Sequence, residues 1–118
     1  MEIKTSYFAK MKKYAGNGVG IAICKYPPKG YRGIVYDKLA PTYEMIQGMK
    51  NPNTRDFFVT KYEIEILSKL NRKEVLSDLE NLTGGKDAIL LCYEKSSDFC
   101  HRHVIAACLG LKRSETEL

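Results

Sequence analysis

The chain has 118 residues, of which 44% are hydrophobic and 28% are charged. This length suits a single domain, and no stretch approaches the roughly 20 apolar residues of a membrane span, which argues against an integral membrane protein. The net charge of +5 favours anionic partners such as phosphates, nucleotides and nucleic acid. The first residues lack the apolar segment of a secretion signal, so we expect a cytoplasmic protein whose four cysteines are reduced.

Two strands are predicted in the first part of the chain. Residues 3–8 alternate apolar and polar side chains, as a strand does, and residues 9–15 suit a short helix. The run VGIAICKY at 19–26 is short, apolar and bounded by turn residues, which predicts a buried strand. The segment YPPKGYRG at 26–33 contains two prolines and two glycines, so it is predicted to be a loop.

The middle of the chain is predicted to be helical. Thr42 is expected to cap a short helix, and length favours a helix over 54–70, although its pattern also resembles a strand. Asn71 and Glu74 resemble a capping box that begins the next helix, and Gly84 is expected to end that helix. Its inward-facing stripe is predicted to consist of Val75, Leu76, Leu79 and Leu82.

The last predicted elements are a buried strand over 88–94 and a helix over 99–111 with Asp98 as its cap. The residues of this helix that are expected to face inward are Val104, Ile105, Cys108 and Leu109. Strands that alternate with helices predict the α/β class. We expect one small, three-layer domain over 1–118, Rossmann-like or flavodoxin-like, with a mostly parallel sheet and helices on both faces.

Reactive side chains are concentrated in the segment LLCYEKSSDFCHRH, residues 90–103. Ligands bind at the carboxyl edge of parallel sheets, and a helix that begins there presents unpaired N–H groups and the positive end of its dipole. We therefore predict an anion site for a phosphate-bearing small molecule or nucleic acid, centred on Cys100, His101 and Arg102. The other ligand-binding residues are predicted to be Lys25, Lys29, Tyr31, Arg32 and Cys92.

Two other functions fit the same residues. A thiol beside histidine and arginine at a helix start is stabilised as a thiolate, so Cys100 could be an enzymatic nucleophile with His101 or Glu94 as proton carrier. Alternatively, the basic clusters and the tyrosines Tyr26 and Tyr31 would suit a module that only binds protein partners. The sequence decides neither whether the chain is an enzyme, nor its substrate, nor its oligomeric state.

Zinc is a further interpretation of this segment. The four potential ligands are Cys92, Cys100, His101 and His103. Adjacent Cys100 and His101 are not easily directed at one ion, and the spacing of the four is irregular, so we predict no metal and no cofactor. Cys92 in an apolar strand suits the protein core, as do Cys24 and Cys108.

The strand Leu90–Glu94, followed by the triplet Cys100, His101 and Arg102, resembles the LLC[FY]E and CHR motifs of the DUF488 family. The stretches TSYF, YPPKGYRG, LAPTYEM and EILSKLNRKEVLSDLENLTGGKD resemble its shorter, single-domain members. The resemblance implies an α/β fold with a parallel sheet and no established reaction. Many relatives have arginine at the position of Lys25, where lysine keeps the charge and loses the bidentate fork. His103 is not part of the motif.

Overall fold

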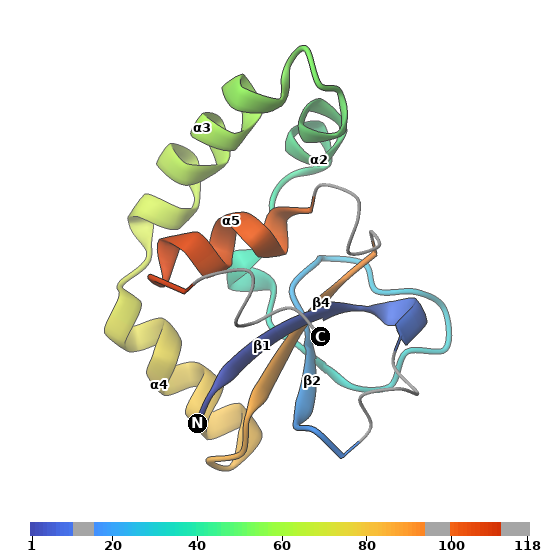
Figure 1. Cartoon of the computed structure of the whole chain (residues 1–118), viewed down its shortest axis with the longest axis vertical. Helices are drawn as coiled ribbons and strands as arrows, with labels where there is room; N and C mark the ends of the chain where they lie inside the picture. The colour runs from blue at the N-terminus through green and yellow to red at the C-terminus, as the bar shows by residue number, and fades with distance from the viewer. Residues whose placement is uncertain (11–15, 94–99, 112–118) are drawn as a thin grey trace.

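A computed structural model of the chain describes residues 1–10, 16–93 and 100–111. Its centre is a sheet of four parallel strands in the order β1-β4-β2-β3 (Figure 1). The strands are β1 (Ile3–Tyr7), β2 (Val19–Ala22), β3 (Ile34–Val35) and β4 (Ala88–Cys92). The helices are α2 (Tyr43–Lys50), α3 (Arg55–Glu65), α4 (Arg72–Thr83) and α5 (His101–Cys108), with 3-10 helices η1 (Phe8–Lys10), η2 (Asp37–Leu39) and η3 (Leu67–Lys69).

Strand β4 is one of the two inner strands of the sheet. Its residue Leu90 pairs with Thr5 of β1 on one side and with Ile21 of β2 on the other. All five residues of β4 are buried, because a strand with neighbours on both sides and layers on both faces has no solvent-exposed side. Since the strands are parallel, the carboxyl ends of β1, β2 and β4 lie at the same edge.

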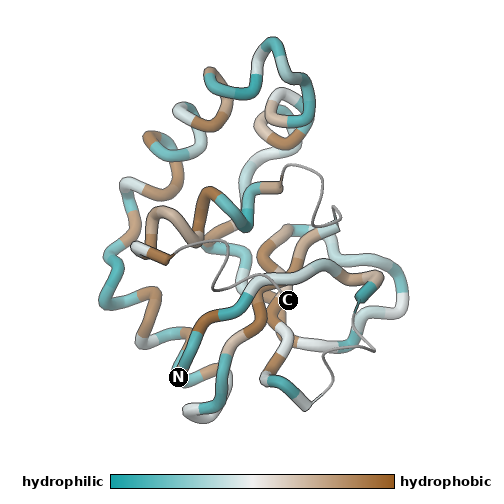
Figure 2. Tube along the Cα trace, in the orientation of Figure 1, coloured by the Kyte–Doolittle hydropathy of each residue, from teal (hydrophilic) through white to brown (hydrophobic). Residues whose placement is uncertain are grey.

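The two faces of the sheet carry different cores. Ala88 and Leu90 of β4 belong to the larger core, whereas Ile89 and Leu91, which alternate with them, belong to the smaller one. Helices α2, α3, α4 and α5 all contribute buried side chains to the larger core, and the tube in Figure 2 shows apolar residues recurring along them. On the other face, Phe8 of η1 joins the smaller core. The predicted three-layer α/β fold with a parallel sheet is confirmed.

The predicted strands are present with shorter bounds. Strand β1 occupies most of 3–8, but β2 ends at Ala22, four residues before the predicted end at Tyr26. Strand β3 was not predicted, because its two residues are too few to show a periodicity. The helix predicted over 9–15 corresponds to η1 only as far as Lys10, and the remainder lies outside the described residues.

The predicted helix caps at Thr42 and Asn71 are confirmed. The side chain of Thr42 accepts a hydrogen bond from the backbone N–H of Met45 at 3.2 Å. The side chain of Asn71 accepts from two backbone N–H groups at the start of α4, and Gly84 ends that helix in the left-handed conformation. The predicted helix over 54–70 is divided into α3 and η3. The proposed cap Asp98 lies outside the described residues.

Two residues that were predicted to face inward are exposed. The buried side chains of α4 are Val75, Leu79 and Thr83, which follow one another at intervals of four, and Leu82 lies at the margin of this line with an exposed fraction of 38%. In α5, Cys108 follows the half-buried Val104 by one turn and is exposed, so its prediction as a core residue is wrong. No helix in the described part of the chain is long and apolar enough to cross a membrane.

A hydrogen bond from Tyr36 to Asp78 joins the segment after β3 to helix α4. The Tyr36 hydroxyl donates to the carboxylate at 2.6 Å, and the Lys38 ammonium lies 3.4 Å from the same oxygen. The bond from Tyr36 lowers the pKa of Asp78, with Lys38 contributing in the same direction. Burial, followed by the bond to Asp78, raises the pKa of Tyr36.

We expect Tyr36→Phe to raise the pKa of Asp78 toward its ordinary value. Because the carboxyl pKa is lowered in the folded protein, its stabilising contribution is present above the unfolded pKa of about 3.9 and is lost as the pH falls through the folded pKa. The stability deficit of the variant should therefore be present at pH 7 and shrink in acid. Carboxyl NMR titration and urea unfolding measure both effects, with Tyr43→Phe as control; an unchanged Asp78 pKa would contradict the prediction.

Candidate functional site

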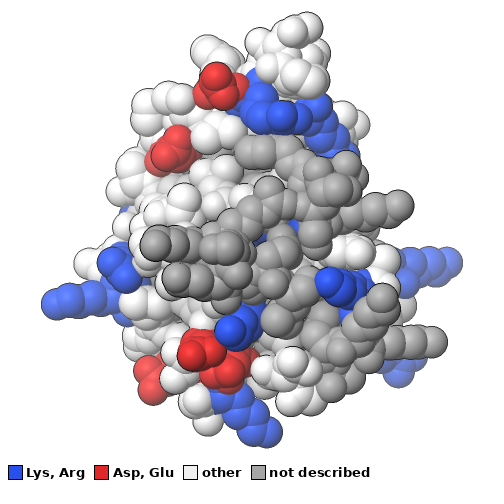
Figure 3. Space-filling view, viewed as in Figure 1, with Lys and Arg blue, Asp and Glu red and all other residues white. Residues whose placement is uncertain are grey.

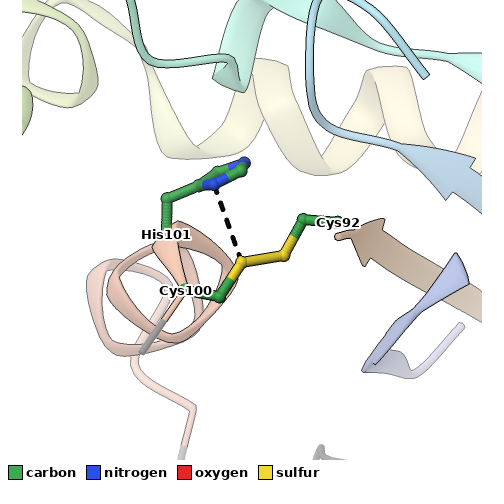
Figure 4. A group of neighbouring side chains, drawn as sticks. All are labelled: Cys92, Cys100 and His101. Atoms are coloured by element: carbon green, nitrogen blue, oxygen red, sulfur yellow. Dashed lines mark hydrogen bonds between the residues drawn. A yellow bond between two sulfur atoms is a disulfide. The ribbon is translucent and has the colours of Figure 1, made fainter. Parts of the chain in front are cut away.

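Cys92 and Cys100 meet at the carboxyl edge of the sheet. Cys92 is the last residue of β4, Cys100 immediately precedes α5, and both are buried. Their sulfur atoms form a disulfide, with the two Cα atoms 7.3 Å apart (Figure 4). The expectation of four reduced cysteines is therefore wrong for this pair. The strand end and the helix start converge at the edge, which brings together two residues that are eight positions apart. Cys24 is buried, as predicted, and forms no disulfide.

His101 is the first residue of α5 and is almost fully buried. Its Nε2 atom lies 2.9 Å from the carbonyl oxygen of Ile23, just beyond β2, and its Nδ1 atom lies 3.7 Å from the sulfur of Cys100. A carbonyl oxygen only accepts hydrogen bonds, so in the neutral ring the proton is on Nε2 and the Nδ1 lone pair faces the sulfur. The ring is thus oriented for proton transfer or for coordination.

Arg102 is fully buried behind the two cysteines. Its guanidinium donates to the sulfur of Cys92 at 3.0 Å and lies over the ring of Tyr7, 5.7 Å from the ring centroid. The fork of Arg102 therefore points at the sulfur pair and at β1. Its side chain has no exposed area among the residues that the structure describes.

A cavity of about 260 Å³ lies beside His101. It is bounded by the segment that follows β2, by helix α2 and by the residue that follows β4. Its polar and aromatic lining residues are Lys25, Tyr26, Tyr43, Gln47, Lys50, Tyr93 and His101. Two of the residues predicted for the site, Lys25 and His101, are thus brought together in one pocket.

Three exposed tyrosines surround this pocket. Tyr26 is 83% exposed, Tyr43 is 77% exposed and Tyr93 is 50% exposed. The hydroxyl of Tyr93 donates to the backbone oxygen of Tyr26, which links the end of β4 to the segment after β2. Large aromatic side chains that remain exposed around one cavity are a feature of sites that bind flat, apolar ligand surfaces.

The structure also adds residues that the sequence did not indicate. Tyr43, Gln47 and Lys50 lie one turn apart on α2, so they present one face of that helix to the pocket. Their spacing is that of any amphipathic helix, and nothing in the sequence shows that α2 borders the same cavity as the segment after β2. No local signal could have found them.

The other predicted residues lie elsewhere. Lys29 and Arg32 are exposed and are not among the residues that line the pocket. Tyr31 packs against the ring of Phe8 at 5.3 Å and donates to the backbone oxygen of Ile34 at 2.8 Å, so it closes the smaller core. Burial raises the pKa of the Tyr31 hydroxyl. Glu94 lies outside the described residues.

The lysine and arginine side chains that the structure describes do not form a single large patch on the face shown in Figure 3. The described lysine and arginine side chains lie at several separate places around this face. A long groove for a nucleic-acid backbone requires a continuous row of such side chains. Lys25 and Lys50 both border the cavity beside His101.

Comparison with known proteins gives one result. A family model, DUF488-N3a, described as the active DUF488-N3 subclade, matches residues 3–113. No curated protein and no solved structure matches the chain.

Proposed function

This chain belongs to the DUF488 family, and from that premise we propose that its pocket binds a nucleotide, with the base against the tyrosines and the phosphate at the lysines. The observation that carries the proposal is the convergence of Lys25, Lys50 and three exposed tyrosines on one cavity. The proposal keeps the anion predicted from the sequence and moves its centre from the Cys100–Arg102 triplet to the cavity beside His101.

The two lysines would supply the charge for a phosphate. Lys25 follows β2, and Lys50 is the last residue of α2, so the two ammonium groups come from separate elements that border the same cavity. A lysine acts on a phosphate as a point charge and does not need the fixed geometry of arginine. The net charge of +5 would also attract anions toward the protein.

The tyrosines would supply the contact with the base. Stacking of a base on an aromatic side chain contributes roughly 1–3 kcal/mol and tolerates any base, since every base has a π face. The volume of about 260 Å³ suits one nucleotide unit rather than a longer chain. We therefore expect mononucleotides to bind as well as short oligonucleotides do.

We expect Lys25→Ala and Lys50→Ala each to weaken nucleotide binding roughly tenfold, because each removes one of two charges beside the phosphate. Isothermal titration with AMP, ATP, inorganic phosphate and a short oligonucleotide measures this. The matched control is Lys29→Ala, which makes the same change in net charge outside the pocket. No binding of any nucleotide by the wild type, or an equal loss in the control, would refute the proposal.

A second candidate function is thiol chemistry at Cys100. It is favoured by the lone pair of His101 Nδ1, which faces the Cys100 sulfur and is held there by the bond to Ile23. In the disulfide state neither sulfur is a nucleophile, so this function belongs to the reduced protein. His101 would then take the proton of the Cys100 thiol, as the sequence predicted.

For this candidate we expect Cys100 of the reduced protein to react with iodoacetamide at pH 6 at least roughly tenfold faster than Cys108. Cys108 is an internal control, because it is exposed and lies at the other end of the same helix. Mass spectrometry of the two peptides gives both rates in one sample. If Cys108 reacts as fast or faster, an activated thiolate at Cys100 is ruled out.

A further inference from the structure

We propose that the reduced pair Cys92 and Cys100 binds one zinc ion together with His101, leaving a fourth position for water or an external ligand. The ligand atoms of these three buried residues all lie within 4.8 Å of one another. Two thiolates and an imidazole are a donor set that suits zinc and does not suit magnesium or calcium. This site does not depend on the proposed nucleotide pocket.

The sulfur–nitrogen distance agrees with tetrahedral coordination. The sulfur of Cys100 lies 3.7 Å from Nδ1 of His101, and the sulfur–nitrogen edge of a tetrahedral zinc site is about 3.6 Å. The sequence suggested that these adjacent residues are not easily directed at one ion, but in the structure their ligand atoms lie close together. Cys100 has extended backbone angles, φ −146° and ψ 149°, whereas His101 begins the helix, so their side chains are not separated by the helical turn and lie together (Figure 4).

The surroundings of His101 match those of a metal ligand. A histidine that binds a metal through one nitrogen normally donates its other ring N–H to a carboxylate or a backbone carbonyl, which fixes the tautomer. The carbonyl of Ile23, at 2.9 Å from Nε2, has this role here, and Nδ1 lies on the side of the Cys100 sulfur. The ring is also held by Tyr62, whose fully buried side chain packs against it edge-on, with 6.1 Å between the ring centroids.

Arg102 would stabilise the thiolate form of Cys92. Its guanidinium already donates to that sulfur at 3.0 Å, and such a bond becomes charge-assisted when the sulfur is ionised. Metal ligands must be deprotonated, and a buried cation beside the thiolate favours that state. Arg102 is thus a positioning residue in this proposal and does not contact the ion.

Formation of the site requires reduction of the disulfide. A phosphine reductant supplies two electrons and becomes the phosphine oxide with an oxygen from water, whose two protons convert the disulfide to two thiols. Binding of Zn²⁺ then releases those two protons as the thiolates coordinate. The Cα atoms of Cys92 and Cys100 are 7.3 Å apart, beyond the range usual for a disulfide, so the reduced sulfurs can separate to the roughly 3.8 Å of a zinc site.

Titration of the full-length, phosphine-reduced protein with Co²⁺ tests the proposal, since cobalt reports thiolate ligands and tetrahedral geometry by its absorption. We expect one ion per chain, a thiolate-to-cobalt charge-transfer band, and stoichiometric displacement by Zn²⁺. Cys100→Ser and His101→Ala should lower the affinity at least roughly 100-fold, more than the loss of an outer residue would. The controls Cys108→Ser and His103→Ala should bind as the wild type does, with circular dichroism checking that each variant is folded.

Three results would overturn the site. The reduced wild type could show no thiolate-to-cobalt band, and this result can be interpreted without any variant. His101→Ala could leave the affinity and the ligand-field spectrum unchanged, in which case His101 is not a ligand. The metal could bind equally well in the presence of the intact disulfide, in which case the sulfurs are not its donors. Each of these results is independent of whether the protein binds a nucleotide.

Discussion

Leu90→Ala is expected to lower the free energy of unfolding by about 3 kcal/mol, within the 2–5 kcal/mol typical of such core substitutions. Leu90 is fully buried at the middle of the inner strand β4, paired with both neighbouring strands, and belongs to the larger core. The cost combines the lost burial of the side chain with the cavity that remains, since the surrounding strands and helices cannot close it completely.

Urea unfolding at pH 7 measures this effect. The matched control is Leu82→Ala, which makes the same chemical change at a residue that is 38% exposed on α4. We expect the control to lose less than about 1 kcal/mol, as surface substitutions do. Similar losses for the two variants would show that Leu90 does not occupy the closely packed centre of the fold.

Arg102→Ala is expected to lower the free energy of unfolding by about 3 kcal/mol as well, and to leave nucleotide affinity of the folded protein unchanged within roughly twofold. The side chain is fully buried between Cys92 and the ring of Tyr7, so its removal leaves a cavity and deletes both contacts. It is not among the residues that line the cavity beside His101. The sequence alone predicts the opposite pattern, since it makes Arg102 a direct ligand of the anion.

Urea unfolding and isothermal titration with AMP distinguish a structural role of Arg102 from direct contact with the ligand. Both are measured at a temperature where the variant is folded. Arg102→Met keeps most of the volume and should lose less stability than the alanine variant, whereas exposed Arg32→Ala should change stability by less than about 0.5 kcal/mol. The opposite result would be an Arg102→Ala variant that keeps the wild-type stability and no longer binds the nucleotide. That result would show that Arg102 contacts the ligand and that its buried position is not its position in the bound protein.

His101 links the three chemistries considered for this edge of the sheet. It lines the pocket, its Nδ1 lone pair faces Cys100, and its Nε2 is bonded to Ile23. The experiments separate these roles by redox state. Nucleotide binding is tested without a reductant and without metal, whereas thiol reactivity and zinc binding are properties of the reduced protein alone. If zinc protects Cys100 from alkylation, the sulfur of Cys100 is both the ligand of the ion and the nucleophile.

The sequence by itself determined the local elements of this protein. The caps at Thr42 and Asn71, the helix end at Gly84 and the buried strand β4 were all predictable, because each depends on a few adjacent residues or on a periodicity within one segment. The parallel sheet followed from the alternation of strands and helices. The same reasoning also indicated the edge at which His101 and Lys25 lie.

Only the tertiary structure decided which side chains meet at that edge. Tyr43 and Lys50 line the pocket because α2 borders the same cavity as the segment after β2, and the chain between these elements carries no signal of that arrangement. Arg102 is buried against Cys92 rather than open to an anion, and Cys100 and His101 point to the same place, because the helix begins between them. Short-range propensities specify elements; the convergence of side chains depends on how those elements pack, which no single segment encodes.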